Sequence, residues 1–168
     1  MAHPAHAVIP PIGLGQGGVT TRESAPCRFQ EGIRAVMADK EKIKQFVQEA
    51  LGCGCPEKVF RSIDCKRNVE LGSGVIVHSV ITIGNRLLVY VVCGNLDFVE
   101  KHLAFLVSVG KKERDSRGLN RFRLVIVMDG FSGNGDAIRR TFGELLEKDE
   151  NIHLHVISSN DKYLDFYH

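Results

Sequence analysis

Near the middle of the chain stand two runs of β-prone apolar residues, VIVHSVITI from Val75 to Ile83 and RLLVYVVC from Arg86 to Cys93. Only Gly84-Asn85 separates them, and a dipeptide of this kind between two such runs is typical of a tight hairpin turn. The pattern therefore predicts an antiparallel hairpin at the centre of the fold.

Helical and extended patterns alternate after this hairpin. Residues 96–109 are apolar on more than one side, which predicts a helix packed on a sheet. The near-continuous apolar run from Phe122 to Met128 indicates a central strand covered on both faces. Helical spacing returns between Ile138 and Leu146, and residues 152–157 form a last apolar run. This alternation favours right-handed parallel crossovers.

The region before the hairpin carries further helical spacing. Apolar residues from Phe29 to Met37 predict a short leading helix, and a stronger apolar stripe predicts a second helix between Asp39, as its N-cap, and Gly52, as its stop. Residues 59–63 are β-prone and predict a short strand. The sequence thus predicts an α/β fold, with a mixed sheet made of an N-terminal antiparallel hairpin and a parallel βαβαβ half, flanked by helices.

Length and composition restrict the class of protein. The chain has 168 residues, 43% of them hydrophobic, and a formal net charge of +2, which is typical of one globular domain. We expect a flexible tail over residues 1–25 and a single α/β domain over residues 26–168. This charge favours neither nucleic-acid nor membrane partners, and residues 1–25 lack the charged start and apolar core of a signal peptide. We therefore expect a cytoplasmic location.

The string LGCGCPE, residues 51–57, places two thiols one residue apart in a glycine-rich corner. Glycine relaxes the backbone, so Cys53 and Cys55 can either approach one ion or close a small disulfide ring. Cys65 and Cys93 extend the set to C-x-C-x9-C-x27-C. Thiols in this number can hold zinc or an iron–sulfur cluster, and Cys53, Cys55 and Cys65 are the candidate metal ligands, although the spacing lacks the C-x2-C pairs of zinc ribbons and ferredoxins.

Cys93 is the candidate catalytic thiol. It ends a predicted strand, and Asn95 is positioned to cap the next helix, whose N-terminus lowers the pKa of a nearby thiol. The turn Cys93-Gly94-Asn95-Leu96 resembles the active-site turn of thioredoxin-like proteins, a resemblance that implies thiol–disulfide exchange. Leu96 stands where that family has its second cysteine, so Cys53 and Cys55 would have to act as the resolving or metal-holding element.

A glycine-rich turn after the central strand is a second candidate site. Ligands of α/β sheets bind at such strand-to-helix turns, and backbone N–H groups at a helix start hold anions. The candidate ligand-binding residues are Asp129, Gly130, Ser132, Gly133 and Gly135. A plain βα connection is the alternative interpretation.

Basic and aromatic residues near the end of the chain allow other interactions. A basic connector, with Phe122 beside it, is compatible with a phosphate-binding patch or with a solvated loop. It consists of Lys111, Lys112, Arg114, Arg117, Arg121 and Arg123. His153 and His155 share one face of the last strand, and the aromatic residues 163–167 leave homo-oligomer formation open.

Two further resemblances bear on function. The element order also resembles the core of restriction-endonuclease-like nucleases, but neither run of the hairpin contains the carboxylates that their metal chemistry needs. Residues 51–60 are similar to a segment of small uncharacterised prokaryotic proteins with a Gly-Cys-Gly-Cys-Pro-Glu element, which implies no particular activity. The leading hypothesis is thiol redox chemistry or metal binding at Cys53 and Cys55. The alternative is a non-catalytic binding or regulatory module for a phosphate-bearing ligand or a protein partner.

Overall fold

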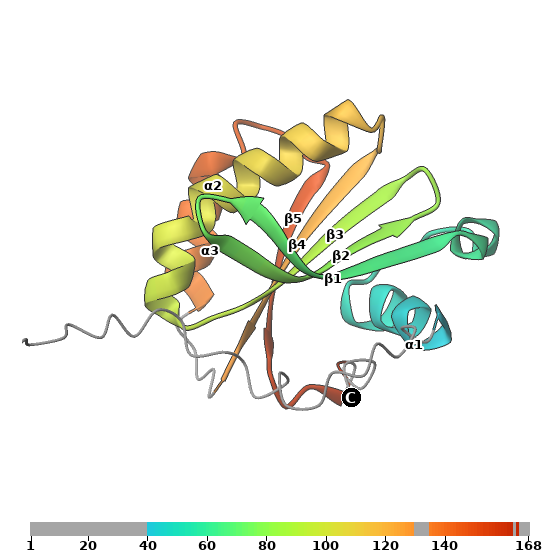
Figure 1. Cartoon of the computed structure of the whole chain (residues 1–168), viewed down its shortest axis with the longest axis horizontal. Coiled ribbons are helices and arrows are strands. Elements are labelled where there is room, and N and C mark those ends of the chain that lie inside the picture. The colour runs from blue at the N-terminus through green and yellow to red at the C-terminus, as the bar shows by residue number, and fades with distance from the viewer. Residues whose placement is uncertain (1–39, 130–134, 163, 165–168) are drawn as a thin grey trace, which may run out of the picture.

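The computed structural model describes residues 40–129, 135–162 and 164. Within them a five-stranded sheet has its strands in chain order, β1-β2-β3-β4-β5 (Figure 1). The strands are β1 (Ile63–Gly72), β2 (Val75–Ile83), β3 (Leu87–Cys93), β4 (Arg121–Met128) and β5 (Ile152–Ser158). The pairs β1–β2 and β2–β3 are antiparallel, whereas β3–β4 and β4–β5 are parallel. The predicted mixed α/β sheet is therefore confirmed.

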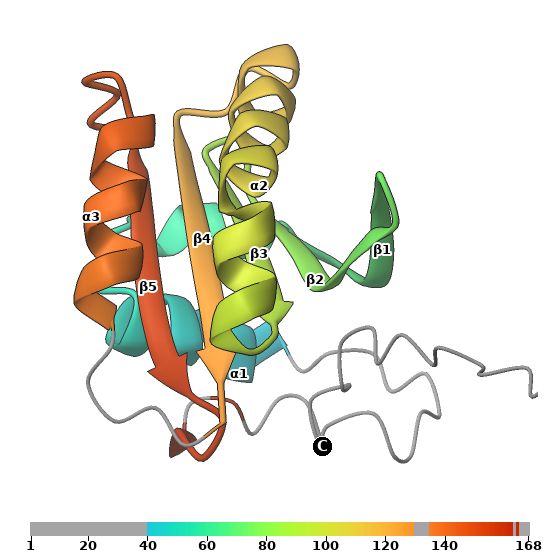
Figure 2. The same cartoon turned by 90° about the vertical axis from the view of Figure 1, so that its left-hand side faces the viewer.

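Helices cover both faces of this sheet (Figure 2). On one face lie α2 (Leu96–Ser116) and α3 (Gly135–Leu145), which connect the parallel strands. On the other face lies α1 (Lys40–Gln45), continued by a π-helical turn, Phe46–Ala50. We call the two sides the helix-pair face and the disulfide face, because the second also carries Cys53 and Cys55.

Several local predictions are confirmed. β2 and β3 form the expected hairpin, in which Ile83 pairs with Leu87, and Gly84 adopts a φ of +54° in its turn. Gly52, with a φ of +59°, follows the end of the π-helical turn. Asn95 caps α2 by accepting a hydrogen bond from the Phe98 N–H at 2.9 Å.

Two sequence-based boundaries were wrong. Residues 59–61 belong to a 3₁₀ helix, Glu57–Arg61, which buries Val59 and Phe60, and the strand begins only at Ile63. Helix α2 continues past Val109 to Ser116. Three residues of the predicted basic connector, Lys111, Lys112 and Arg114, therefore lie in this helix. Gly110 did not end this helix because it is a packing position: a Cβ there would lie 2.1 Å from Cζ of Phe122 on β4.

The β1–β2 hairpin contributes to both hydrophobic layers. Near its open end, Ile81 and Ile83 belong to the core of the disulfide face. Near its tip, Val75 and Val77 belong to the core of the helix-pair face. The change of face coincides with Asn68, whose φ of +50° interrupts the regular strand. One hairpin therefore spans the two cores.

Some expectations fall on residues outside the described part of the chain, namely the tail over 1–25, the leading helix over 29–37 and the Asp39 cap. Among the residues described, no helix combines the length and the apolar character needed to cross a membrane.

Candidate functional site

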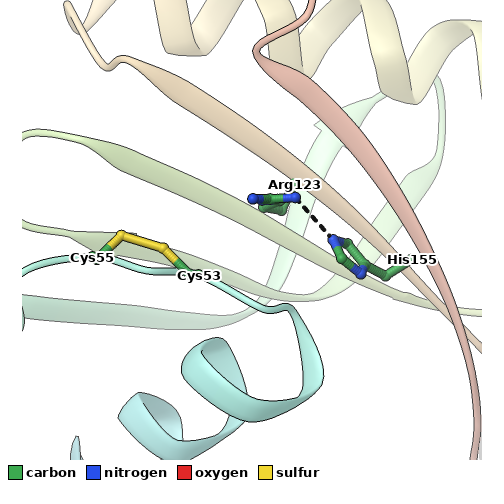
Figure 3. Close-up of a disulfide and its surroundings, with 4 residues drawn as sticks. All are labelled: Cys53, Cys55, Arg123 and His155. Atoms are coloured by element: carbon green, nitrogen blue, oxygen red, sulfur yellow. Dashed lines mark hydrogen bonds between the residues drawn. A yellow bond between two sulfur atoms is a disulfide. The ribbon is translucent and has the colours of Figure 1, made fainter.

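A disulfide between Cys53 and Cys55 is the chemical focus of the disulfide face (Figure 3). Their Cα atoms are 5.4 Å apart, within the usual range for a disulfide. The Cys53 N–H donates to the Val47 carbonyl at 3.1 Å, which ties the segment to the end of the π-helical turn. The pair is thus anchored by backbone contacts and lies just after Gly52.

The two sulfur-bearing residues differ in accessibility. Cys53 is only 3% exposed and packs in the core of the disulfide face. Cys55 is half-buried and lines a surface pocket of about 240 Å³. A reagent in solution therefore reaches the disulfide through Cys55.

This pocket lies where the parallel strands begin. Leu87 is the first residue of β3, Arg121 is the first of β4, and Asn151 directly precedes β5. Its lining residues are Gly54, Cys55, Pro56, Arg86, Leu87, Asn120, Arg121 and Asn151. The Asn120 and Arg121 N–H groups both donate to the Arg86 carbonyl at 2.9 Å. These backbone bonds hold two arginine-bearing segments against each other beside Cys55.

A buried arginine and a half-buried histidine form a pair on the same face. Arg123, 7% exposed, donates from Nη1 to Nε2 of His155 at 3.2 Å, as the dashed line in Figure 3 shows. Burial, with Arg123 and His153 nearby, lowers the pKa of His155 to about 4, so its neutral ring can accept this bond. Burial, followed by the charge of Arg121, lowers the pKa of Arg123. The Nε of Arg123 is buried and has no hydrogen-bond partner among the described residues.

The arginines near the disulfide have no ion-pair partner among the described residues. The ion pairs found within the described residues do not involve Arg86, Arg121 or Arg123. The rest of the predicted basic connector behaves differently. Arg114 is buried and binds Asp149 with two hydrogen bonds of 3.0 and 2.7 Å, while Arg117 pairs with Glu113 and Lys111 with Glu147. Those three cations therefore have acidic partners within the fold, whereas Arg86 and Arg121 have none among the described residues.

Cys93 is half-buried at the other end of β3. Six residue steps separate it from Leu87 in the pocket wall, which is about 20 Å along a strand. The structure therefore does not bring Cys93 to the Cys53–Cys55 pair, and a mechanism in which Cys93 attacks and that pair resolves has no geometric support.

The metal hypothesis gains no support from side-chain placement. Cys65 lies in β1, half-buried on the disulfide face. Burial raises the pKa of its thiol above the ordinary value, and Arg67 and a hydrogen bond with Ser79 offset only part of this rise. Within the described ranges, His, Cys, Asp and Glu side chains nowhere form a group of three or more that could hold an ion. Cys53 and Cys55 are joined to each other instead.

The predicted ligand-binding turn is only partly described. Asp129 is exposed just after β4, and Gly135 is buried at the start of α3. Gly130, Ser132 and Gly133 lie outside the described residues.

Three residues of the pocket were missed by sequence reasoning: Arg86, Asn120 and Asn151. Each comes from a different turn, at the beginning of a different strand. The available signal was the parallel order of β3, β4 and β5, because the amino ends of parallel neighbours meet at one edge of a sheet.

Comparisons of the chain with protein-family models, with curated proteins and with solved structures find no match.

Proposed function

We propose that this protein is a thiol–disulfide exchange protein whose redox centre is the Cys53–Cys55 pair. The observation that carries the proposal is the asymmetry of the pair: Cys55 lines an open, cationic pocket, and Cys53 is buried behind it. Redox proteins with two cysteines need this division between one thiol that meets the partner and one that resolves the intermediate.

Cys55 is the contact cysteine in this scheme. Arg86 and Arg121 line the same pocket, and neighbouring cations favour the thiolate over the thiol. In the reduced protein the Cys55 thiolate attacks a sulfur of a partner disulfide and releases one partner thiolate, which takes up a proton. Cys53 then loses its proton to solvent, attacks Cys55 Sγ in the mixed disulfide and releases the second partner thiolate. The protein dithiol is oxidised to a disulfide, and the partner disulfide is reduced to two thiols.

A purely structural role for the disulfide has little physical basis. A cross-link stabilises mainly by restricting the unfolded chain, and the stabilisation becomes smaller as the closed loop becomes shorter. This bond spans a sequence separation of 2, so it closes almost the smallest loop that a chain allows.

Thiol titration tests the proposal directly. The chain has 5 cysteines, and mild oxidation of the reduced protein should remove two titratable thiols, which dithiothreitol restores. The Cys53→Ser, Cys55→Ser variant should show no such loss, whereas a matched Cys65→Ser variant should keep it. In a Cys53→Ser variant, a partner disulfide should leave a stable mixed disulfide on Cys55, identified by peptide mass.

Two results would contradict this function. The first is a wild-type protein whose Cys53 and Cys55 stay reduced under mild oxidant. The second is stoichiometric zinc or iron in anaerobically purified wild type that is absent from the double serine variant, which would assign the pair to a metal site.

A further inference from the structure

We infer that the pocket beside Cys55 selects a small partner thiol, or its disulfide, that carries negative charge. This inference rests on the proposed redox function and adds the chemical class of the partner. The residues that would recognise it are Arg86 and Arg121, with the side-chain amides of Asn120 and Asn151 beside them.

The charge of the lining residues indicates an anion. Apart from Cys55 itself, the ionisable residues that line the pocket are Arg86 and Arg121, and neither takes part in an ion pair within the described ranges. Arg123, two residues after Arg121, adds a third guanidinium on the same face, and its buried Nε still lacks a partner among the described residues. Guanidinium groups bind carboxylates through paired N–H donors, so a carboxylate-bearing partner fits this wall.

The size of the pocket indicates a small molecule. Its volume of about 240 Å³ is below the roughly 300–1,000 Å³ of pockets that enclose drug-sized ligands. That space accepts a thiol of a few heavy atoms with an acidic group, and the open side allows a longer partner to extend into solvent.

A partner thiol of this kind reduces the Cys53–Cys55 disulfide in two steps. The partner thiolate attacks Cys55 Sγ, the Cys53–Cys55 bond breaks, and the electron pair goes to Cys53 Sγ, which takes a proton from solvent. A second partner thiolate attacks the partner sulfur of the mixed disulfide and releases the Cys55 thiolate. Two partner thiols are oxidised to one disulfide, and the protein disulfide is reduced to two thiols.

The first experiment compares three probe thiols as reductants of the oxidised full-length protein: 2-mercaptoethanesulfonate (anionic), 2-mercaptoethanol (neutral) and cysteamine (cationic). Rate constants are expressed per thiolate. We expect the anionic probe to react about tenfold faster than the cationic one at low salt, and this ratio to shrink as salt screens the arginines. In an Arg86→Gln, Arg121→Gln variant the ratio of the anionic to the cationic rate constant should approach one.

A matched variant controls for net charge. Lys112 and Arg140 are exposed on α2 and α3, which cover the opposite face of the sheet (Figure 2). Lys112→Gln, Arg140→Gln removes the same two charges and should leave the selectivity intact.

A second measurement does not depend on redox cycling. In a Cys53→Ser variant, the ratio of the alkylation rate with iodoacetate to the rate with iodoacetamide should be higher for Cys55 than for a small free thiol in solution. Adding Arg86→Gln, Arg121→Gln should abolish this preference. Iodoacetate and iodoacetamide differ in charge and little in size, so the ratio reports the field at Cys55.

The outcomes separate the two proposals. Reduction at similar rates by all three probes, or a charge preference that persists in the Arg86→Gln, Arg121→Gln variant, would overturn the anionic partner and leave the redox function standing. A pair that no thiol reduces would refute the redox function, and the anionic partner with it, even if the alkylation ratio still showed a cationic pocket.

Discussion

Reduction of the Cys53–Cys55 disulfide should cost the folded protein little stability. The bond joins residues with a separation of 2, and chain-entropy arithmetic for a three-residue loop gives about 1.6 kcal/mol at 25 °C. A 15-residue loop would give about 3 kcal/mol by the same relation. The remaining contacts of Cys53 with the core of the disulfide face do not depend on the bond. The reduced protein should therefore stay folded, as a redox carrier must.

The measurement is urea unfolding at pH 7, followed by far-ultraviolet circular dichroism, with and without a non-thiol reductant. With a slope of about 2 kcal/mol per molar urea, the midpoint should fall by less than about 1 M. The Cys53→Ser, Cys55→Ser variant should show no reductant-dependent shift, which assigns the effect to this pair. A loss of about 4 kcal/mol or more, or unfolding on reduction alone, would refute the reasoning and make the bond a structural cross-link.

Three further predictions test the scaffold. Gly110→Ala should destabilise the protein by about 1–3 kcal/mol through overpacking against Phe122, and Phe122→Leu should restore part of the loss; a neutral Gly110→Ala would contradict the close approach. Asp149→Asn should cost about 1.5–3 kcal/mol in urea unfolding, because it removes one of the two carboxylates that bind the buried guanidinium of Arg114 and leaves only Asp115; a change below about 0.5 kcal/mol would show a screened surface pair. Burial lowers the pKa of His155 from 6.5 to about 4. As the pH falls, the ring is therefore protonated in the unfolded chain before it is protonated in the folded protein. The free energy of unfolding should decrease by up to about 3 kcal/mol between pH 6.5 and about pH 4. His155→Gln should flatten that part of the stability curve, and an unchanged slope would contradict the assignment.

The central and parallel parts of the fold could be predicted because their signals are local. The turn residues Gly84-Asn85 predict the β2–β3 hairpin, and the apolar run of β4 predicts a buried strand, without information from the rest of the chain. The Asn95 cap is equally local, since its side chain bonds a backbone N–H three residues ahead.

Where tertiary packing overrides local preference, the sequence misleads. The β-prone run at Val59 and Phe60 forms a 3₁₀ turn that buries both side chains on the disulfide face. β1 alternates half-buried and exposed residues and carries charges on its exposed side, so it lacks the apolar run that marked the other strands. Gly110 has the residue type of a helix end, and only the ring of Phe122 explains its place inside α2.

The two cysteines of the candidate site could be predicted from the sequence, whereas the residues that form the pocket beside them could not. The spacing of Cys53 and Cys55 already indicated either a shared ion or a small ring. The pocket beside them depends on residues that lie more than thirty positions further along the chain, among them Arg86 and Arg121. Such a convergence follows from the parallel pairing of β3 with β4, which no spacing within one segment can reveal.

The β1–β2 hairpin packs in both hydrophobic layers and so couples their stability. Its open end is packed with the disulfide segment, through Ile81 and Ile83, and its tip is packed with the helix pair, through Val75 and Val77. Loss of packing in one layer would therefore displace a hairpin that also packs in the other layer. The domain should therefore unfold as one cooperative unit.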